Sequence, residues 1–179
     1  MKTHTDRILS IIKFLFWLVF IGLCIKTGAI ILSFIISLFS HSEAAGDLYL
    51  GLNLAELYQN HFWYFICLVT LIIGLSAMKT YIAFLVTKIF TKINFDTPFN
   101  NITACLLTNI SHMALGAGIL ALIANAYNMY LFKRSLIDLS AQSFVEGSRE
   151  FLFLAGIIFI IAQIFKKGVD LQSENELTI

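Results

Sequence analysis

The residues best suited to chemistry in this sequence lie in one apolar stretch, residues 104–127. His112 follows Thr108 by four positions, which places both on one face of a helix, and Asn109 and Asn125 add polar groups. An imidazole inside an apolar helix can relay protons or bind a ligand. It can also hydrogen-bond to a neighbouring helix. We favour this second interpretation, because no further histidine or carboxylate follows at metal-ligand spacing.

Two further groups of residues carry side chains that bind metals in other proteins. Histidines and carboxylates occupy or flank the segment 40–60, but their separations match no recognised ligand pattern, so we predict no metal site: His41, Glu43, Asp47, Glu56 and His61. The cysteines lack CxxC spacing and are expected to be small core residues: Cys24, Cys67 and Cys105. The sequence has no GxSxG, HExxH or phosphate-binding glycine loop. We therefore predict no catalytic residue, no cofactor and no enzymatic activity.

The elements that carry these residues are long and apolar. Of the 179 residues, 59% are hydrophobic and 13% charged, and the mean hydropathy is +0.85, well beyond ordinary soluble domains. About 20 helical residues cross the hydrocarbon core of a bilayer. Four blocks of that length lie at approximately residues 8–39, 61–90, 104–127 and 147–167. We predict an all-α fold, a single-domain integral membrane bundle of four transmembrane helices followed by a short tail, 168–179.

The distribution of lysine and arginine predicts the orientation of the spans. Cytoplasmic flanks are enriched in both residue types, whereas the first connecting segment, 40–60, has carboxylates and no basic residue. Both termini are therefore predicted to be cytoplasmic. Lys133 and Arg134, in the second outer segment 128–148, run against this pattern. The net charge of +1 argues against direct binding to nucleic acid. The basic residues assigned to the cytoplasm are Lys2, Arg7, Lys13, Lys79, Lys88, Lys92, Lys166 and Lys167.

Two features inside the apolar blocks concern packing. Lys26 interrupts the first block, and an ammonium group is costly at mid-bilayer. We favour a lysine that snorkels outward over one in a buried ion pair. Small residues recur at four-residue spacing in the third block, as in Ala114 with Gly118 and Ala117 with Ala121. Because this spacing lets helix backbones approach closely, the third helix is expected to lie centrally.

Two polar segments resemble those of a bacterial membrane family, domain of unknown function 2975. The turn at residues 93–101 resembles the Pro-Phe turn after the second helix of that family, and residues 165–179 resemble its close, with a basic helix exit, a glycine and a Glu-Asn-x-Leu-Thr ending. The likeness spans most of the chain. It rests on Pro98, Phe99, Lys166, Lys167, Glu174, Asn175, Leu177 and Thr178.

The resemblance implies a multi-pass protein of the bacterial inner (cytoplasmic) membrane with no established activity. Members are often encoded beside a small helix-turn-helix regulator, which implies a cytoplasmic protein partner. The residues that carry the resemblance then form a candidate docking surface on the cytoplasmic face. One alternative is an accessory subunit or assembly factor of a larger membrane complex. Another is a small-molecule binder or transporter that uses Asn109, His112 and Asn125.

Overall fold

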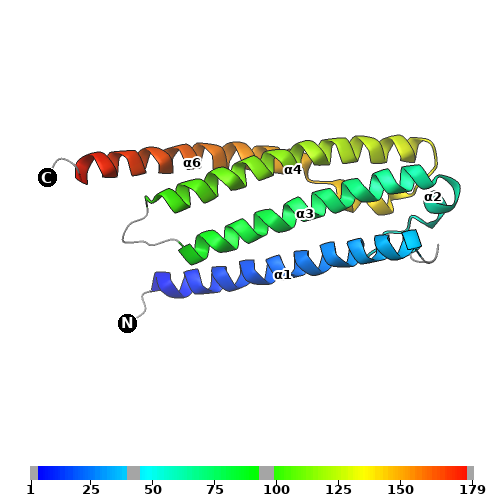
Figure 1. The fold of residues 1–179 in the computed structure, drawn as a ribbon, viewed down its shortest axis with the longest axis horizontal. Helices are drawn as coiled ribbons and strands as arrows, with labels where there is room; N and C mark the ends of the chain where they lie inside the picture. Colours follow the sequence, from blue (N-terminus) through cyan, green and yellow to red (C-terminus); the bar gives the residue numbers. More distant parts are fainter. Residues whose placement is uncertain (1–3, 40–44, 93–98, 177–179) are drawn as a thin grey trace.

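The computed structural model describes residues 4–39, 45–92 and 99–176, and four long helices dominate it (Figure 1). They are α1 (His4–Phe39), α3 (Phe62–Lys92), α4 (Asn101–Lys133) and α6 (Ser148–Glu176). The described residues contain no strand, and four spans are long and apolar enough to cross a membrane. The predicted fold class is confirmed. In a bilayer such helices satisfy their backbone hydrogen bonds internally.

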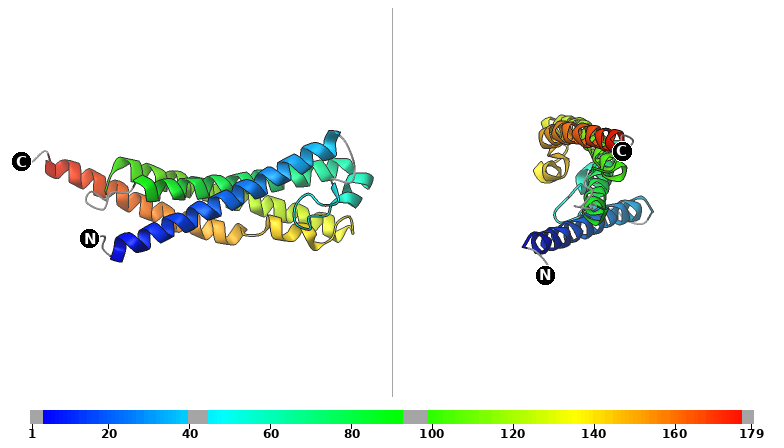
Figure 2. Two further views of the ribbon diagram at one scale, coloured as in Figure 1. Left: turned by 90° about the horizontal axis from the view of Figure 1, so that it is seen from below. Right: turned by 90° about the vertical axis from the view of Figure 1, so that its left-hand side faces the viewer.

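The four helices form an open row, because α1 packs on α3, α3 on α4 and α4 on α6. The view along the long axis shows that the row does not close, with α1 and α6 at its two margins (Figure 2). Successive helices run in opposite directions (Figure 1). The described ends of α1 and α6 therefore lie at one end of the molecule, which we call the lysine-rich end for the basic residues that it carries: Arg7, Lys13, Lys92, Lys166 and Lys167.

Small residues of α4 let its neighbours approach closely, as the four-residue spacing predicts. Ala114, Ala117, Gly118 and Ala121 are all buried. A Cβ on Gly118 would lie 2.7 Å from Leu152 of α6, and one on Gly116 would lie 2.8 Å from Met78 of α3. Helix α4 therefore lies between α3 and α6. Residues of both neighbours approach the α4 backbone so closely at Gly116 and Gly118 that a larger side chain would not fit.

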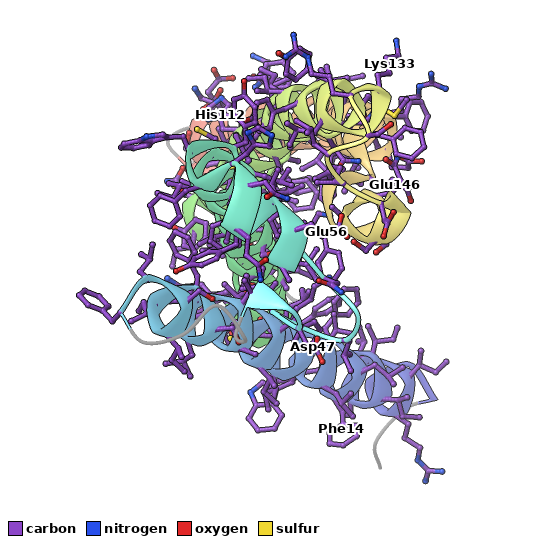
Figure 3. All side chains as sticks on the ribbon, turned by 90° about the vertical axis from the view of Figure 1, so that its right-hand side faces the viewer. Phe14, Asp47, Glu56, His112, Lys133 and Glu146 are labelled. Atoms are coloured by element: carbon purple, nitrogen blue, oxygen red, sulfur yellow. The ribbon has the colours of Figure 1, made fainter. Side chains whose placement is uncertain are left out.

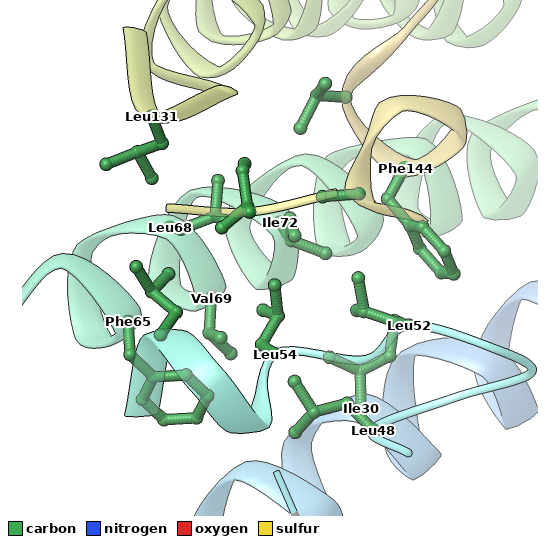
Figure 4. Close-up of a cluster of buried hydrophobic side chains, with 14 of the residues drawn as sticks. Ile30, Leu48, Leu52, Leu54, Phe65, Leu68, Val69, Ile72, Leu131 and Phe144 are labelled. Carbon is green, nitrogen blue, oxygen red and sulfur yellow. The ribbon is translucent and has the colours of Figure 1, made fainter. Parts of the chain in front are cut away.

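The opposite end of the molecule is closed by an apolar corner around the short helix α2 (Ala55–Asn60). Residues of α1, of the segment 45–54, of α3 and of α5 meet there in one buried cluster (Figure 4). Phe65 is its largest fully buried side chain and stands edge-on to Tyr58, with ring centroids 5.1 Å apart. The Tyr58 hydroxyl donates to the carbonyl of Ser37 at 2.9 Å, which ties α2 to the end of α1.

The segment between α4 and α6 folds back into the molecule, although the sequence suggested an outer loop from 128 to 148. Helix α4 continues to Lys133, and the chain then forms the 3₁₀ turn η2 (Leu139–Ala141) and helix α5 (Gln142–Val145). Ile137, Phe144 and Val145 are buried among residues of α3 and α4. These buried apolar residues hold the segment against the row.

The fourth span is a broken helix. Its apolar stretch runs from α5 into α6, but Glu146 and Gly147 interrupt it, and Gly147 has a φ of +103°. That conformation favours glycine, which has no Cβ to clash with the backbone. Helix α6 consequently begins at Ser148, about halfway along α4, and extends past the start of α4 at the lysine-rich end (Figure 1).

Two helix boundaries differ from the sequence prediction. Helix α6 continues through Gly168 to Glu176, so most of the segment expected as a tail is helical. Helix α4 begins at Asn101, because the Asn100 side chain accepts a hydrogen bond of 2.7 Å from the backbone N–H of Thr103. Asparagine is a favoured N-cap for this reason. Pro98 lies outside the described residues.

Candidate functional site

Two lysines meet near the middle of the row, on the side of the broken fourth span. Lys26 lies about 13 residues, or ~20 Å, from the end of α1 at Phe39, and Lys79 lies about 17 residues, or ~26 Å, from the start of α3 at Phe62. The two helices are joined beside them, where Thr27 and Thr80 share a hydrogen bond of 3.0 Å.

Both ammonium groups point to the break between α5 and α6. Lys26 Nζ lies 4.5 Å from the centroid of the Phe144 ring. Lys79 Nζ donates to the carbonyl of Glu146 at 3.2 Å and lies 5.5 Å from the centroid of the Phe151 ring. An ammonium over an aromatic face is stabilised by the ring quadrupole. The break is thus held from two helices, α1 and α3, by cationic side chains.

These contacts bear on two expectations about the lysines. Neither lysine forms an ion pair with a described residue, and Lys26 is half-buried over the Phe144 ring, so its outward snorkelling stays a prediction. Lys79 was assigned to the cytoplasmic flank but lies well inside α3. The described contacts pair the two ammonium groups with aromatic rings and a backbone carbonyl and with no carboxylate. This cluster therefore has excess positive charge inside apolar spans, where charge is costly.

The lysine-rich end brings together part of the predicted docking surface. Phe99 packs at a tilt against Phe165 with ring centroids 5.3 Å apart, and a Cβ on Gly168 would clash with the Phe99 ring. The turn before α4 is thus packed on α6 where the basic pair lies, and Lys166 and Lys167 are exposed. Glu174 is exposed further along α6. Asn175 lies on α6, but its side chain is not among those described. Pro98, Leu177 and Thr178 lie outside the described residues.

The polar residues of α4 do not form one site. Asn109 and His112 are exposed, and Thr108 donates to the carbonyl of Ala104 in its own helix instead of to His112. His112 makes no hydrogen bond within the described ranges. In the view along the helix axes, His112 and Glu146 lie on opposite sides of the row (Figure 3). Asn125 is several turns away, so the binding site suggested by Asn109, His112 and Asn125 is not assembled here.

Possible metal ligands are likewise dispersed. The described part of the chain contains no cluster of three or more His, Cys, Asp or Glu side chains suited to a metal ion. His61 packs at a tilt against Tyr64, with ring centroids 5.5 Å apart, while His41 and Glu43 lie outside the described residues. Asp47 accepts a hydrogen bond of 3.2 Å from the backbone N–H of Gly51. Asp47 therefore supports the backbone of this segment.

A family model matches residues 49–179, which is most of the chain. The family is described as a protein of unknown function, DUF2975. The chain belongs to this family. No curated protein and no solved structure matches it. The resemblance recognised from the two polar segments is confirmed.

The DUF2975 match divides the lysine cluster. Lys79, Glu146 and Phe151 lie inside the matched region, whereas Lys26 and the whole of α1 precede it. The core of the cluster is therefore the contact between α3 and the broken fourth span, to which α1 adds a second cation. The sequence contained one indication of this cluster, because Lys26 and Lys79 both interrupt long apolar blocks.

A polar network missed by sequence reasoning holds α5 to α4 in this DUF2975 protein. Gln142 Nε2 donates to Asn125 Oδ1 at 3.3 Å, and Asn128 Nδ2 donates to Gln142 Oε1 at 2.9 Å. Asn128 is 1% exposed, and its Oδ1 has no partner within the described ranges. Exchanging the amide nitrogen and oxygen of these side chains would leave the Asn128 nitrogen unpaired instead. The network therefore contains one unsatisfied buried polar atom in either assignment.

Replacing Asn128 by alanine is expected to destabilise the protein by about 2 kcal/mol, because Gln142 loses a donor inside the core. Asn125→Ala removes a longer hydrogen bond at a half-buried position and should cost about 1 kcal/mol or less. Unfolding by SDS in mixed micelles, followed by circular dichroism, measures both. Equal losses for the two variants would contradict the stronger role assigned to Asn128.

Proposed function

We propose that this protein is a non-enzymatic, multi-pass protein of a bacterial inner (cytoplasmic) membrane that binds a cytoplasmic protein at its lysine-rich end. The observation that carries the proposal is the continuation of α6 as a helix beyond Gly168, where Phe99 makes its last described contact with it. The final turns of α6 extend beyond the row (Figure 1). They present a helical surface that the described part of the chain does not cover.

The charge distribution supports the proposed orientation. Exposed Arg7, Lys13, Lys92, Lys166 and Lys167 share this end. The other end carries Asp47, Glu56 and Asp138 together with Lys133 and Arg134. Because basic residues favour the cytoplasmic side, both termini would face the cytoplasm. Lys166 and Lys167 would also attract anionic headgroups, at about 1 kcal/mol each.

The chemistry of the α6 extension suits a helical or grooved protein partner. Leu171 is 50% exposed, and Asp170 and Glu174 lie one residue before and three residues after it. An apolar anchor flanked by charges is how a helix is recognised in a groove. The family resemblance makes a helix-turn-helix regulator the first candidate. Contact with DNA would then be indirect, through that partner.

Deleting residues 174–179 or replacing Leu171 by serine is expected to lower recovery of the partner at least about tenfold, corresponding to about 1.4 kcal/mol of binding free energy. Co-purification of cytoplasmic proteins with the full-length chain in mild detergent, quantified by mass spectrometry, measures this. Leu50→Ser is the matched control, because Leu50 is an 81% exposed leucine at the opposite end. Unchanged recovery with both α6 variants would eliminate the extension as the contact.

The open row supports a second candidate function, an accessory subunit or assembly factor of a larger membrane complex. Asn109, whose amide donates only a long hydrogen bond of 3.9 Å to Cys105 Sγ, and His112, which makes none within the described ranges, are exposed on α4 inside a span, where incompletely paired polar side chains are unfavourable in lipid. A partner helix that packs on this face would satisfy them. A stoichiometric membrane protein that co-purifies with the chain and is lost in His112→Leu would favour this function over the first.

A further inference from the structure

A cleft runs beside the contact between α1 and α3 at the lysine-rich end. It comprises two adjoining cavities with volumes of about 400 Å³ and about 340 Å³, which share Trp17, Thr87 and Thr91 in their linings. Lys13 borders the first cavity and Lys88 the second. Volumes in this range are typical of sites for small molecules and cofactors. The cleft does not overlap the lysine cluster at the break or the α6 extension.

The walls of the cleft are aromatic and apolar. Trp17 and Phe20 come from α1 and Phe84 from α3, and Phe20 and Phe84 pack together with ring centroids 5.8 Å apart. The Thr87 hydroxyl donates to the carbonyl of Ala83 at 2.8 Å, and the Thr91 hydroxyl donates to that of Lys88 at 2.8 Å. Their protons are therefore used within α3, and the lysines are the charged donors of the lining.

The charge of the cleft is positive only. Lys88 Nζ lies 6.0 Å from the centroid of the Phe84 ring, and Lys13 of α1 borders the adjoining cavity. Helix α3 has no acidic residue, and neither does α1 after Arg7. No carboxylate of these two helices therefore neutralises the pair. An anion placed between Lys13 and Lys88 would meet two ammonium groups and no opposing charge from the cleft walls.

The position of the cleft along the helices matches that of a lipid headgroup. Lys88 lies about one turn from the end of α3 at Lys92, and Trp17 lies about one turn further into α1 than Lys13. Lysine at the membrane surface with tryptophan just below it is the arrangement found at membrane–water interfaces. A phosphate at the level of the lysines would leave its acyl chains beside Trp17, Phe20 and Phe84.

We propose that this cleft binds an anionic phospholipid, with the phosphate between Lys13 and Lys88 and an acyl chain along Trp17, Phe20 and Phe84. Basic pockets between transmembrane helices recognise anionic headgroups through this chemistry. A zwitterionic phospholipid fills the apolar part equally well but brings its own cation to the two lysines. The cleft therefore selects lipids by headgroup charge. This selection does not depend on the docking function proposed for α6.

The two tryptophans of the chain, Trp17 and Trp63, allow a direct test. Trp63 is 76% exposed at the other end of α3, so Trp63→Phe leaves Trp17 as the single fluorophore without disturbing the core. This protein is reconstituted into phosphatidylcholine vesicles that contain increasing fractions of dibrominated phosphatidylglycerol or dibrominated phosphatidylcholine. Quenching of Trp17 by the bromine atoms gives the relative binding constant of each lipid for the cleft.

Phosphatidylglycerol is expected to bind at least about fivefold more tightly than phosphatidylcholine. This ratio of binding constants corresponds to the attraction of about one lysine for an anionic lipid. Lys13→Gln together with Lys88→Gln should bring the ratio close to one. The matched control, Lys92→Gln with Lys167→Gln, removes the same charge from the same end without touching the cleft lining and should keep the preference. A ratio near one in the chain with both lysines intact, or an equal loss in the control, overturns the proposal.

Discussion

Replacing Gly118 by leucine is expected to destabilise the protein by about 3 kcal/mol or more, the upper range for overpacking. Even a methyl group at this position would lie 2.7 Å from Leu152 Cγ and 3.1 Å from the Leu152 backbone nitrogen. A side chain can rotate away, but the backbone of α6 can yield only by moving the helix. The variant should therefore separate α4 from α6, and SDS titration in mixed micelles measures the change.

The matched control for this variant is Gly156→Leu. Gly156 lies on α6, is exposed, and has no atom within 4 Å of an added Cβ. Leucine there gains helix propensity over glycine, by up to about 1 kcal/mol, and meets no neighbour. The SDS concentration at the midpoint of unfolding of Gly156→Leu should equal or exceed that of the unsubstituted chain. If both variants lost the same stability, the loss at Gly118 would reflect glycine replacement in general and not the close approach of two helices.

The close approach at Gly118 was predictable from the sequence, because it follows from residue size and spacing alone. Small residues four positions apart share a helix face whatever the partner is. The four spans were predictable for a similar reason, since the number of apolar residues needed to cross a bilayer is fixed by its thickness. Both properties are local. Neither required knowledge of which helices are neighbours.

The fold between α4 and α6 was not predictable in this way. The segment 128–148 was expected to be an outer loop, but its residues after Arg134 pack on α3 and α4 because tertiary contacts outweigh composition. The extension of α6 to Glu176 was hidden by its polar residues, which resemble those of a tail although they lie on a continuous helix. A polar helix has no apolar periodicity to reveal it.

The candidate sites were predictable only where they depend on neighbours in sequence. Lys166 and Lys167 follow an apolar block, and their exposure followed from that position. The contact of Phe99 with Phe165 and Gly168 joins two segments far apart in the chain. The meeting of Lys26 and Lys79 at the broken span depends in addition on the register of α1 against α3. No pattern within either helix sets that register.

Phe65→Ala is expected to cost about 3 to 5 kcal/mol, the range for removing a buried aromatic ring. Phe65 is fully buried, and its ring contacts Tyr58 edge-on at 5.1 Å and Phe34 of α1 at 6.0 Å between centroids. The cavity would therefore open at the point where α1, α2 and α3 meet (Figure 4). Because α1 packs only on α3 among the long helices described, the variant should loosen α1 before the rest of the row.

Phe62→Ala separates the cavity effect from the loss of an aromatic pair. Phe62 also stands edge-on to Tyr58, at 5.4 Å, but is 40% exposed. Its removal should cost about 1 kcal/mol, the value of an aromatic pair without a buried cavity. SDS titration gives both free energies, and protease sensitivity of α1 at low SDS shows whether it detaches first. Comparable costs for the two variants would mean that ring pairing with Tyr58, rather than burial of Phe65, holds the corner together.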